Sequence, residues 1–246
     1  MPFARRFGEI MAKCGAIVPL RLWFHTLWFS GVILAFCAWY LSITEPGTLP
    51  VILNKALADG AMILIGLSFG LSGLCYFWDF VDCLIIYRKY LGLAGFAFGL
   101  SHAVMSLVFY LWWKPRGYET NPIFILDHQW NFGTFFVSNL YAFAAALVAL
   151  AIFIMMAVIS NRYAIEELGG IWWRRLLRVG YLAYVSAALH FFIKNFPEWR
   201  MMLETSTMVL PPLNFMIFLL VCAVIALRLA LTIAIWQKKQ TLLQKV

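Results

Sequence analysis

The chain has 246 residues, of which 64% are hydrophobic and only 12% are charged. Soluble domains are about 45–50% apolar and about 25% charged, so a water-soluble core cannot absorb this much apolar surface. The composition excludes soluble, disordered and collagen-like proteins and predicts a polytopic membrane protein, in which the net charge of +8 must be interpreted from its position along the chain.

Six apolar segments are long enough to cross a bilayer, because a spanning helix needs about 20 mostly apolar residues. We therefore predict an all-α fold, a six-transmembrane-helix bundle that forms a single transmembrane domain over residues 1–246. The predicted spans cover residues 20–43, 60–80, 90–113, 135–160, 177–196 and 210–236. The first apolar segment is too long for a cleavable signal, and no small-residue cleavage site follows it.

The basic residues predict the orientation, because cytoplasmic loops of membrane proteins carry an excess of lysine and arginine. With the N-terminus inside, thirteen basic residues fall in cytoplasmic segments and five in outer segments, and Arg228 lies within the sixth span. We expect both termini to be cytoplasmic. An anionic lipid surface explains the positive charge better than nucleic acid does, so membrane lipid is an expected partner and nucleic acid is not.

Two smaller features complete the scan along the chain. The inner loop over residues 161–178 is predicted to be an amphipathic segment, with Trp172 and Trp173 at the depth of the membrane interface. The five cysteines form no CxxC pair, so they are interpreted as buried thiols and not as a zinc site or a disulfide framework.

Two histidines fall well inside predicted spans, His102 in the third and His190 in the fifth. Ionisable residues are costly in a bilayer, so each is a functional candidate. Arg88 precedes His102 by 14 residues, about 21 Å of helix, and Arg178 precedes His190 by 12 residues, about 18 Å. Because both spans run from inside to outside, the rings are predicted to lie at matching depth. Two imidazoles at one level can ligate a haem iron from opposite sides.

Small residues line the histidine faces of these spans. Gly99 and Gly95 precede His102 by three and seven residues, and Ala187 and Ala183 precede His190 in the same way. A helical side chain covers the turn before its own Cα, so these positions are predicted to leave room for a porphyrin. Two alternatives stay open. The histidines can serve a proton or ion path in a coupled transporter, and the small residues can serve helix packing in a structural scaffold.

Two segments resemble the ferric reductase-like transmembrane domain family. RKYLGLAGFAFGLSH, from Arg88 to His102, is similar to the R-R-x-L-G-L-x8-H segment of that family's third helix, and residues 160–190 resemble its T-S-N-x5-LG-x2-W-x2-LHR-L-x-YLA-x6-LH segment. The branch that the chain resembles most is the haem-binding membrane subunit of the bacterial periplasmic methionine sulfoxide reductase system. The resemblance implies a b-type cytochrome of the bacterial inner membrane that passes electrons across the bilayer, with His102 and His190 as iron ligands.

One position departs from the family pattern. Family members often carry a second histidine thirteen residues earlier on the fifth helix, where this chain has Leu177, which cannot ligate iron. We therefore expect one haem b, held by His102 and His190 and bordered by Gly99 and Ala187.

The electron donor and acceptor must be other molecules, since the chain has no nucleotide-binding fingerprint. A cytoplasmic flavin reductase, a membrane quinol or a bound flavin such as FMN is expected as the donor, and the outer-side acceptor is left open. Clustered arginines could hold a flavin phosphate or haem propionates, although membrane topology alone also explains them. This cationic inner rim comprises Arg88, Lys89, Arg174, Arg175 and Arg178.

Three further residues are weighed. His25 is expected to be an interfacial histidine, with ligation of a second haem as the alternative, and His128 is expected in a solvated outer loop. Arg228 is expected to snorkel inward or to pair with a propionate, Asp79 or Asp82.

Overall fold

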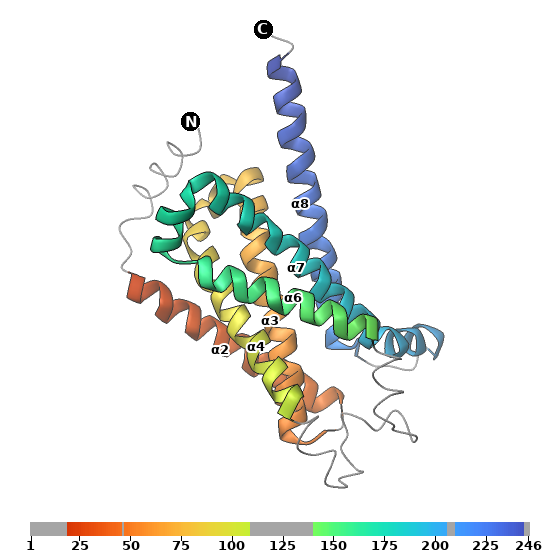
Figure 1. Cartoon of the computed structure of the whole chain (residues 1–246). Helices are drawn as coiled ribbons and strands as arrows, with labels where there is room; N and C mark the ends of the chain where they lie inside the picture. The colour runs from red at the N-terminus through yellow and green to blue at the C-terminus, as the bar shows by residue number, and fades with distance from the viewer. Residues whose placement is uncertain (1–18, 46, 109–139, 206–209, 244–246) are drawn as a thin grey trace.

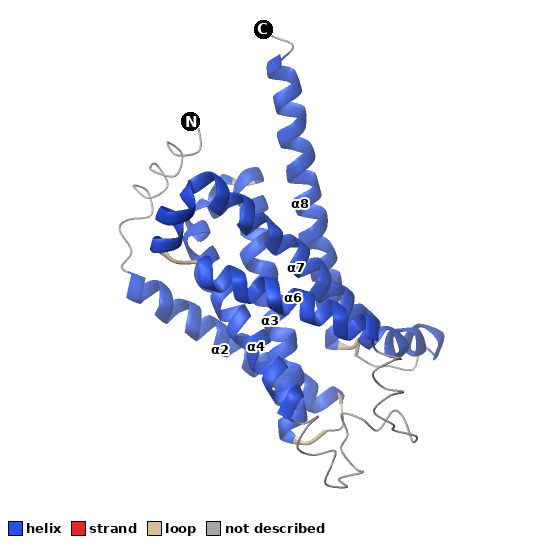
Figure 2. Ribbon diagram, in the orientation of Figure 1, coloured by secondary structure: helices blue, strands red, loops and turns tan. Residues whose placement is uncertain are grey.

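The computed structural model describes residues 19–45, 47–108, 140–205 and 210–243. Within these residues the regular structure is helical throughout (Figures 1 and 2). Six helices are long and apolar enough to cross a membrane. The prediction of an all-α bundle of six spanning helices is confirmed, and the chain is a multi-pass membrane protein.

The elements follow one another with short connections wherever these are described. Their bounds are α2 Pro19–Thr44, α3 Leu49–Phe77, η1 Asp79–Tyr87, α4 Arg88–Val108, α6 Leu140–Ile159, α7 Arg162–Thr205 and α8 Leu213–Leu243. Residues 109–113 of the predicted third span and 135–139 of the predicted fourth span lie outside the described residues.

The second span begins well before its predicted start near Gly60. Helix α3 starts at Leu49, with a proline in its first turn, where the missing N–H costs no hydrogen bond. The polar residues Asn54, Lys55 and Asp59 interrupt the apolar pattern of this stretch. The bundle accommodates them, since Asn54 and Asp59 are only 5% and 4% exposed and Lys55 forms an ion pair with Glu45.

Local hydrogen bonds explain where the fifth helix starts and turns. Asn161 caps α7, because its Oδ1 accepts the backbone N–H of Ala164 at 2.8 Å. The helix kinks at Gly169, whose φ of 68° is open to glycine at little cost. The indole N–H of Trp173 donates to the carbonyl of Ile159 at 3.0 Å and ties α7 to the end of α6. The predicted amphipathic segment is thus the first part of α7.

Helix α3 is the centre of the bundle. It packs against α2, α4 and α8, and less extensively against η1 and α7. Helix α6 packs mainly against α7 and also contacts α4. The largest cluster of buried apolar side chains joins α2, α3, α7 and α8. Helix α6 therefore links α4 to α7.

Glycine allows α4 to approach α3 closely. A Cβ added at Gly95 would lie 2.7 Å from Cγ1 of Ile65 and 3.0 Å from its backbone nitrogen. The prediction that Gly95 leaves room for a porphyrin is therefore wrong, because the space at this position is filled by α3. Close helix packing through small residues is the physical reason.

Successive spans alternate in direction, so α2 begins and α8 ends on one side of the bundle, here named the termini side (Figure 1). Helices α3, α6 and α8 begin on the other side, here named the opposite side. The interpretation of the cysteines as buried thiols is confirmed for Cys37 and Cys75, whereas Cys222 is a free thiol but exposed. It is wrong for Cys83, which is disulfide-bonded.

Candidate functional site

His102 is held by a backbone carbonyl of the neighbouring helix. Its Nδ1 lies 3.0 Å from the carbonyl oxygen of Asn54 in α3, and the residue is half-buried. A carbonyl oxygen only accepts hydrogen bonds, so Nδ1 carries the hydrogen and donates it. In a neutral ring this leaves the lone pair of Nε2 available for another ligand.

His190 has the same arrangement, with a backbone carbonyl of helix α6 in place of one of α3. Its Nδ1 donates to the carbonyl oxygen of Ala142 in α6 at 2.8 Å, and the residue is again half-buried. Within the described part of the chain, neither Nε2 atom takes part in a hydrogen bond. Each ring is thus held through Nδ1, and its Nε2 is available to a ligand.

The two carbonyls place the rings in the same half of the bundle. Asn54 lies in the second turn of α3 and Ala142 in the first turn of α6. Both helices begin on the opposite side. His102 and His190 therefore lie toward the opposite side of the bundle. Each is bonded to a carbonyl of a neighbouring helix.

Helix α6 brings the two histidine helices together. It contacts α4 and packs extensively on α7, whereas α4 and α7 hardly touch one another directly within their described residues. Helix α6 thus contacts both of the helices that carry the histidines.

The two small residues predicted to border the haem differ in their surroundings. A Cβ at Gly99 would meet only the methyl group of Ala61, at an ordinary contact distance of 3.7 Å. Packing against α3 therefore does not require glycine there. Ala187 is half-buried and packs against the main apolar cluster, so that cluster accounts for its surroundings.

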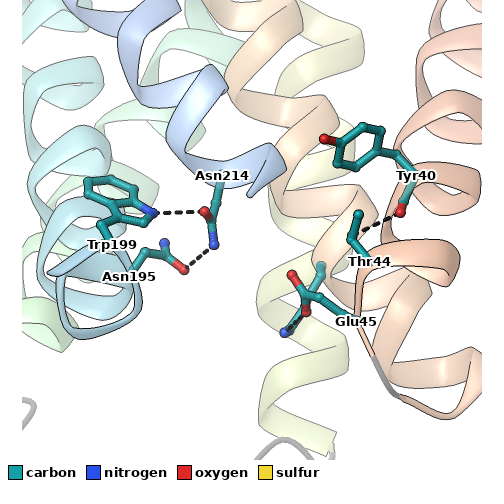
Figure 3. A network of polar contacts seen from close by, with 7 residues as sticks. Tyr40, Thr44, Glu45, Asn195, Trp199 and Asn214 are labelled. Atoms are coloured by element: carbon teal, nitrogen blue, oxygen red, sulfur yellow. Dashed lines mark hydrogen bonds and ion pairs between the residues drawn. The ribbon is translucent and has the colours of Figure 1, made fainter. Parts of the chain in front are cut away.

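A polar network fixes α7 one turn beyond His190 (Figure 3). The amide of Asn195 donates to the carbonyl of Phe191 at 2.7 Å. Asn214 of α8 donates to Asn195 Oδ1 at 2.9 Å and accepts from the indole N–H of Trp199 at 2.8 Å. Sequence reasoning missed this network, although its two asparagines stand out in apolar segments.

The cationic inner rim does not converge on the histidines. The guanidinium of Arg175 lies 4.8 Å from the ring centroid of the exposed Trp172. Arg178 and Lys89 are exposed, whereas Arg88 is half-buried. The side chain of Arg174 lies outside the described residues. Arg88 thus differs in its burial from the exposed members of the rim.

Other sequence candidates lie apart from the two rings. The Nδ1 of His25 forms a hydrogen bond of 2.9 Å with the hydroxyl of Tyr87, near the start of α2 on the termini side. The guanidinium of Arg228 lies over the ring of Tyr181, 4.4 Å from its centroid. His128 lies outside the described residues.

Sequence reasoning also missed polar groups in the first turns of α3. The amide of Asn54 donates to the hydroxyl of Ser106 at 3.0 Å, one turn beyond His102. Asp59 is a carboxylic acid buried in the same helix. Both precede Gly60, where the predicted span began, so a longer hydropathy window over residues 49–59 was the available signal.

A search for metal-binding clusters and a comparison with known protein families both bear on the site. No three His, Cys, Asp or Glu side chains gather as a metal site in the part of the chain that the structure describes. No family model matches the chain. The resemblance to the ferric reductase-like family therefore stays a prediction.

Proposed function

We propose that the chain is a transmembrane electron-transfer protein in which His102 and His190 are the axial ligands of one haem b. The observation that carries this proposal is the paired anchoring of the rings. Each Nδ1–H donates to a backbone carbonyl of a neighbouring helix. Histidines that ligate metals almost always donate their other N–H to a carbonyl, a carboxylate or water, which fixes the tautomer and the ring orientation.

The donor set fits a porphyrin iron. Two neutral imidazoles in the same half of the bundle supply two nitrogens, which suits a group whose remaining four ligands come with it. When bound, the haem supplies one-electron redox chemistry. The carbonyls of Asn54 and Ala142 hold the rings in orientation, and Gly99 offers space that packing does not use.

The described basic residues support an orientation for the proposed path. Seven lie nearer the termini side and three nearer the opposite side, while Arg228 lies midway along α8. The first group comprises Arg21, Arg88, Lys89, Arg175, Arg178, Lys238 and Lys239, and the second Lys55, Lys194 and Arg200. By the positive-inside rule the termini side is cytoplasmic. Together with the family resemblance, this favours a bacterial inner membrane protein whose haem lies toward the outer face.

Electrons then enter from the cytoplasmic side or from the membrane. A cytoplasmic flavin reductase, a quinol, or a flavin such as FMN bound at the termini side would supply them, and an acceptor outside would take them. About 21 Å of helix separates Arg88 from His102. An electron donor must bridge this distance or bind within this half of the bundle.

Electron transfer through the membrane tests the proposal. The haem-loaded protein is reconstituted in vesicles that enclose ferricyanide, and reduced FMN is added outside. We expect ferricyanide reduction that His102→Ala or His190→Ala abolishes and His25→Ala preserves. His25 is the matched control, because it is a histidine with one ring nitrogen bonded that lies elsewhere in the bundle.

The same vesicles separate the competing explanations. A coupled transporter predicts solute uptake that depends on a proton gradient and on both histidines, without stoichiometric iron. Uptake of that kind, with no electron transfer in protein supplied with haem, would contradict the electron-transfer proposal.

A further inference from the structure

Two arginines lie inside the bundle in its termini-side half. Arg228 is midway along α8. Arg88 is the first residue of α4, and its carbonyl accepts a hydrogen bond of 2.7 Å from the hydroxyl of Ser68, in the middle part of α3. Both arginines are half-buried. Arg228 therefore lies within a span, whereas Arg88 lies at the start of one.

The two arginines belong to one neighbourhood. The guanidinium of Arg228 covers the ring of Tyr181 at 4.4 Å, and Tyr181 stacks on Phe69 with ring centroids 4.6 Å apart. Phe69 follows Ser68, whose hydroxyl bonds the carbonyl of Arg88. Tyr181 and Arg228 are the side chains whose electrostatic effect reaches Arg88.

Among the residues that the structure describes, this arrangement leaves the positive charge without a carboxylate counter-ion, since no carboxylate forms an ion pair with Arg88 or Arg228. The aromatic face of Tyr181 offsets part of the charge of one guanidinium. Like charges in one neighbourhood of a membrane span are costly, and intramembrane arginines normally pair with an opposite charge or a ligand.

We propose that Arg88 and Arg228 together bind a phosphate group, supplied by an anionic phospholipid or by a soluble phosphate compound. Guanidinium groups match phosphate oxygens with pairs of parallel hydrogen bonds. A phospholipid is the source that the surroundings favour, because Leu229 and Leu182, which directly follow Arg228 and Tyr181, are exposed and can contact an acyl chain.

This site is independent of the proposed haem. Fourteen residues of α4, about 21 Å, separate Arg88 from His102. The phosphate site can therefore be correct if the chain binds no haem, and it can fail while the haem proposal stands.

Retention of phospholipid is the first test. The full chain is purified with phosphatidylglycerol and examined by native mass spectrometry, beside Arg88→Gln, Arg228→Gln and the double variant. We expect the wild type to keep bound phosphatidylglycerol and the double variant to lose it. Arg175→Gln is the matched control, because Arg175 is exposed on Trp172, and it should retain lipid as the wild type does. Equal retention by wild type and double variant would overturn the proposal.

Thermal unfolding in detergent identifies the source of the phosphate. Phosphatidylglycerol should raise the unfolding midpoint of the wild type and not that of the double variant, while phosphatidylcholine has a smaller effect. If inorganic phosphate alone gives the same shift, a soluble phosphate compound is the source and the site stands. If no phosphate-bearing probe shifts the wild type more than the double variant, the site is refuted.

The direction in which Arg228→Gln shifts the unfolding midpoint is a further test, and it needs no added ligand. If the arginines merely repel one another, Arg228→Gln relieves the repulsion and raises the unfolding midpoint. If they share a bound phosphate in the purified protein, the same substitution lowers it. Arg228→Lys keeps the charge but removes the paired geometry, so it should fold as the wild type does and still lose lipid. A raised midpoint for Arg228→Gln, or full lipid retention by Arg228→Lys, would contradict the proposal.

Discussion

The two halves of the bundle handle buried polar groups in different ways. Toward the opposite side, each histidine has one nitrogen bonded to a backbone carbonyl and one nitrogen without a protein hydrogen bond in the described chain. Toward the termini side, the guanidinium of Arg228 lies over the ring of Tyr181, in the same neighbourhood as Arg88. The first half offers neutral nitrogen donors, as a metal requires, and the second offers positive charge, as an anion requires.

This difference indicates that polarity inside a span is informative only together with its partners. A histidine ring whose Nδ1–H donates to a backbone carbonyl has the arrangement that is common among metal-ligating histidines. An arginine paired with a carboxylate serves structure, whereas an unpaired one in a span requires another source of negative charge.

The largest expected effect is the loss of haem on removal of either ligand. His102→Ala or His190→Ala should abolish the Soret band of purified protein, because one imidazole cannot hold the iron from both sides. His25→Ala should leave the spectrum unchanged. A full Soret band in either ligand variant, measured at equal protein concentration, would show that the ring in question is not a ligand.

Two glycines of α4 can be compared, because Gly95 packs closely against α3 and Gly99 has room for a side chain. Gly95→Ala should destabilise the protein by about 1–3 kcal/mol, since its Cβ would meet Ile65 at 2.7 Å. Gly99→Ala should be tolerated, because its Cβ would meet only Ala61 at 3.7 Å. Unfolding midpoints in detergent measure both effects. Equal losses at the two positions would mean that Gly99 also serves close packing.

The asparagine network should stabilise the end of α7. Asn214→Leu leaves the indole N–H of Trp199 without its acceptor, and Trp199 is only 3% exposed. A buried polar group left unpaired costs about 1–3 kcal/mol. Hydrogen exchange at Trp199 and the unfolding midpoint report the change. Unaltered exchange and midpoint would show that the network contributes nothing to the position of α7 relative to α8.

The smallest effect is expected at Asn54. Asn54→Ala removes the side-chain bond to Ser106 but keeps the backbone carbonyl that accepts from His102. Hydrogen bonds between membrane helices contribute about 0.6 kcal/mol on average, so stability should fall slightly and the haem spectrum should persist. Loss of haem in this variant would mean that the side chain, and not the carbonyl, positions His102.

Sequence alone predicted the bundle well and its polar interior only in part. Hydropathy found all six spans because twenty apolar residues in a row have few other structural solutions. It placed the start of α3 too late, since Asn54 and Asp59 broke the apolar pattern although both are buried. Polar residues that are buried inside the bundle lower the hydropathy average, so the boundary of the span is predicted in the wrong place.

The anchors of the histidines were beyond sequence reasoning for a different reason. His102 and His190 could be singled out by depth, but their partners are the backbone carbonyls of Asn54 and Ala142. Every residue has such a carbonyl, so no residue type marks the one that accepts. The neighbourhood of Arg88 and Arg228 likewise depends on how α4, α7 and α8 meet around α3.

The most direct test of the central claim is the haem content of the wild-type protein. The full chain is expressed with haem supplied, purified, and analysed by its visible spectrum and by a pyridine haemochrome count. We predict a Soret band, a reduced α-band of haem b and one haem per chain, as a single pair of axial imidazoles requires. A folded protein that stays colourless under these conditions would contradict the account.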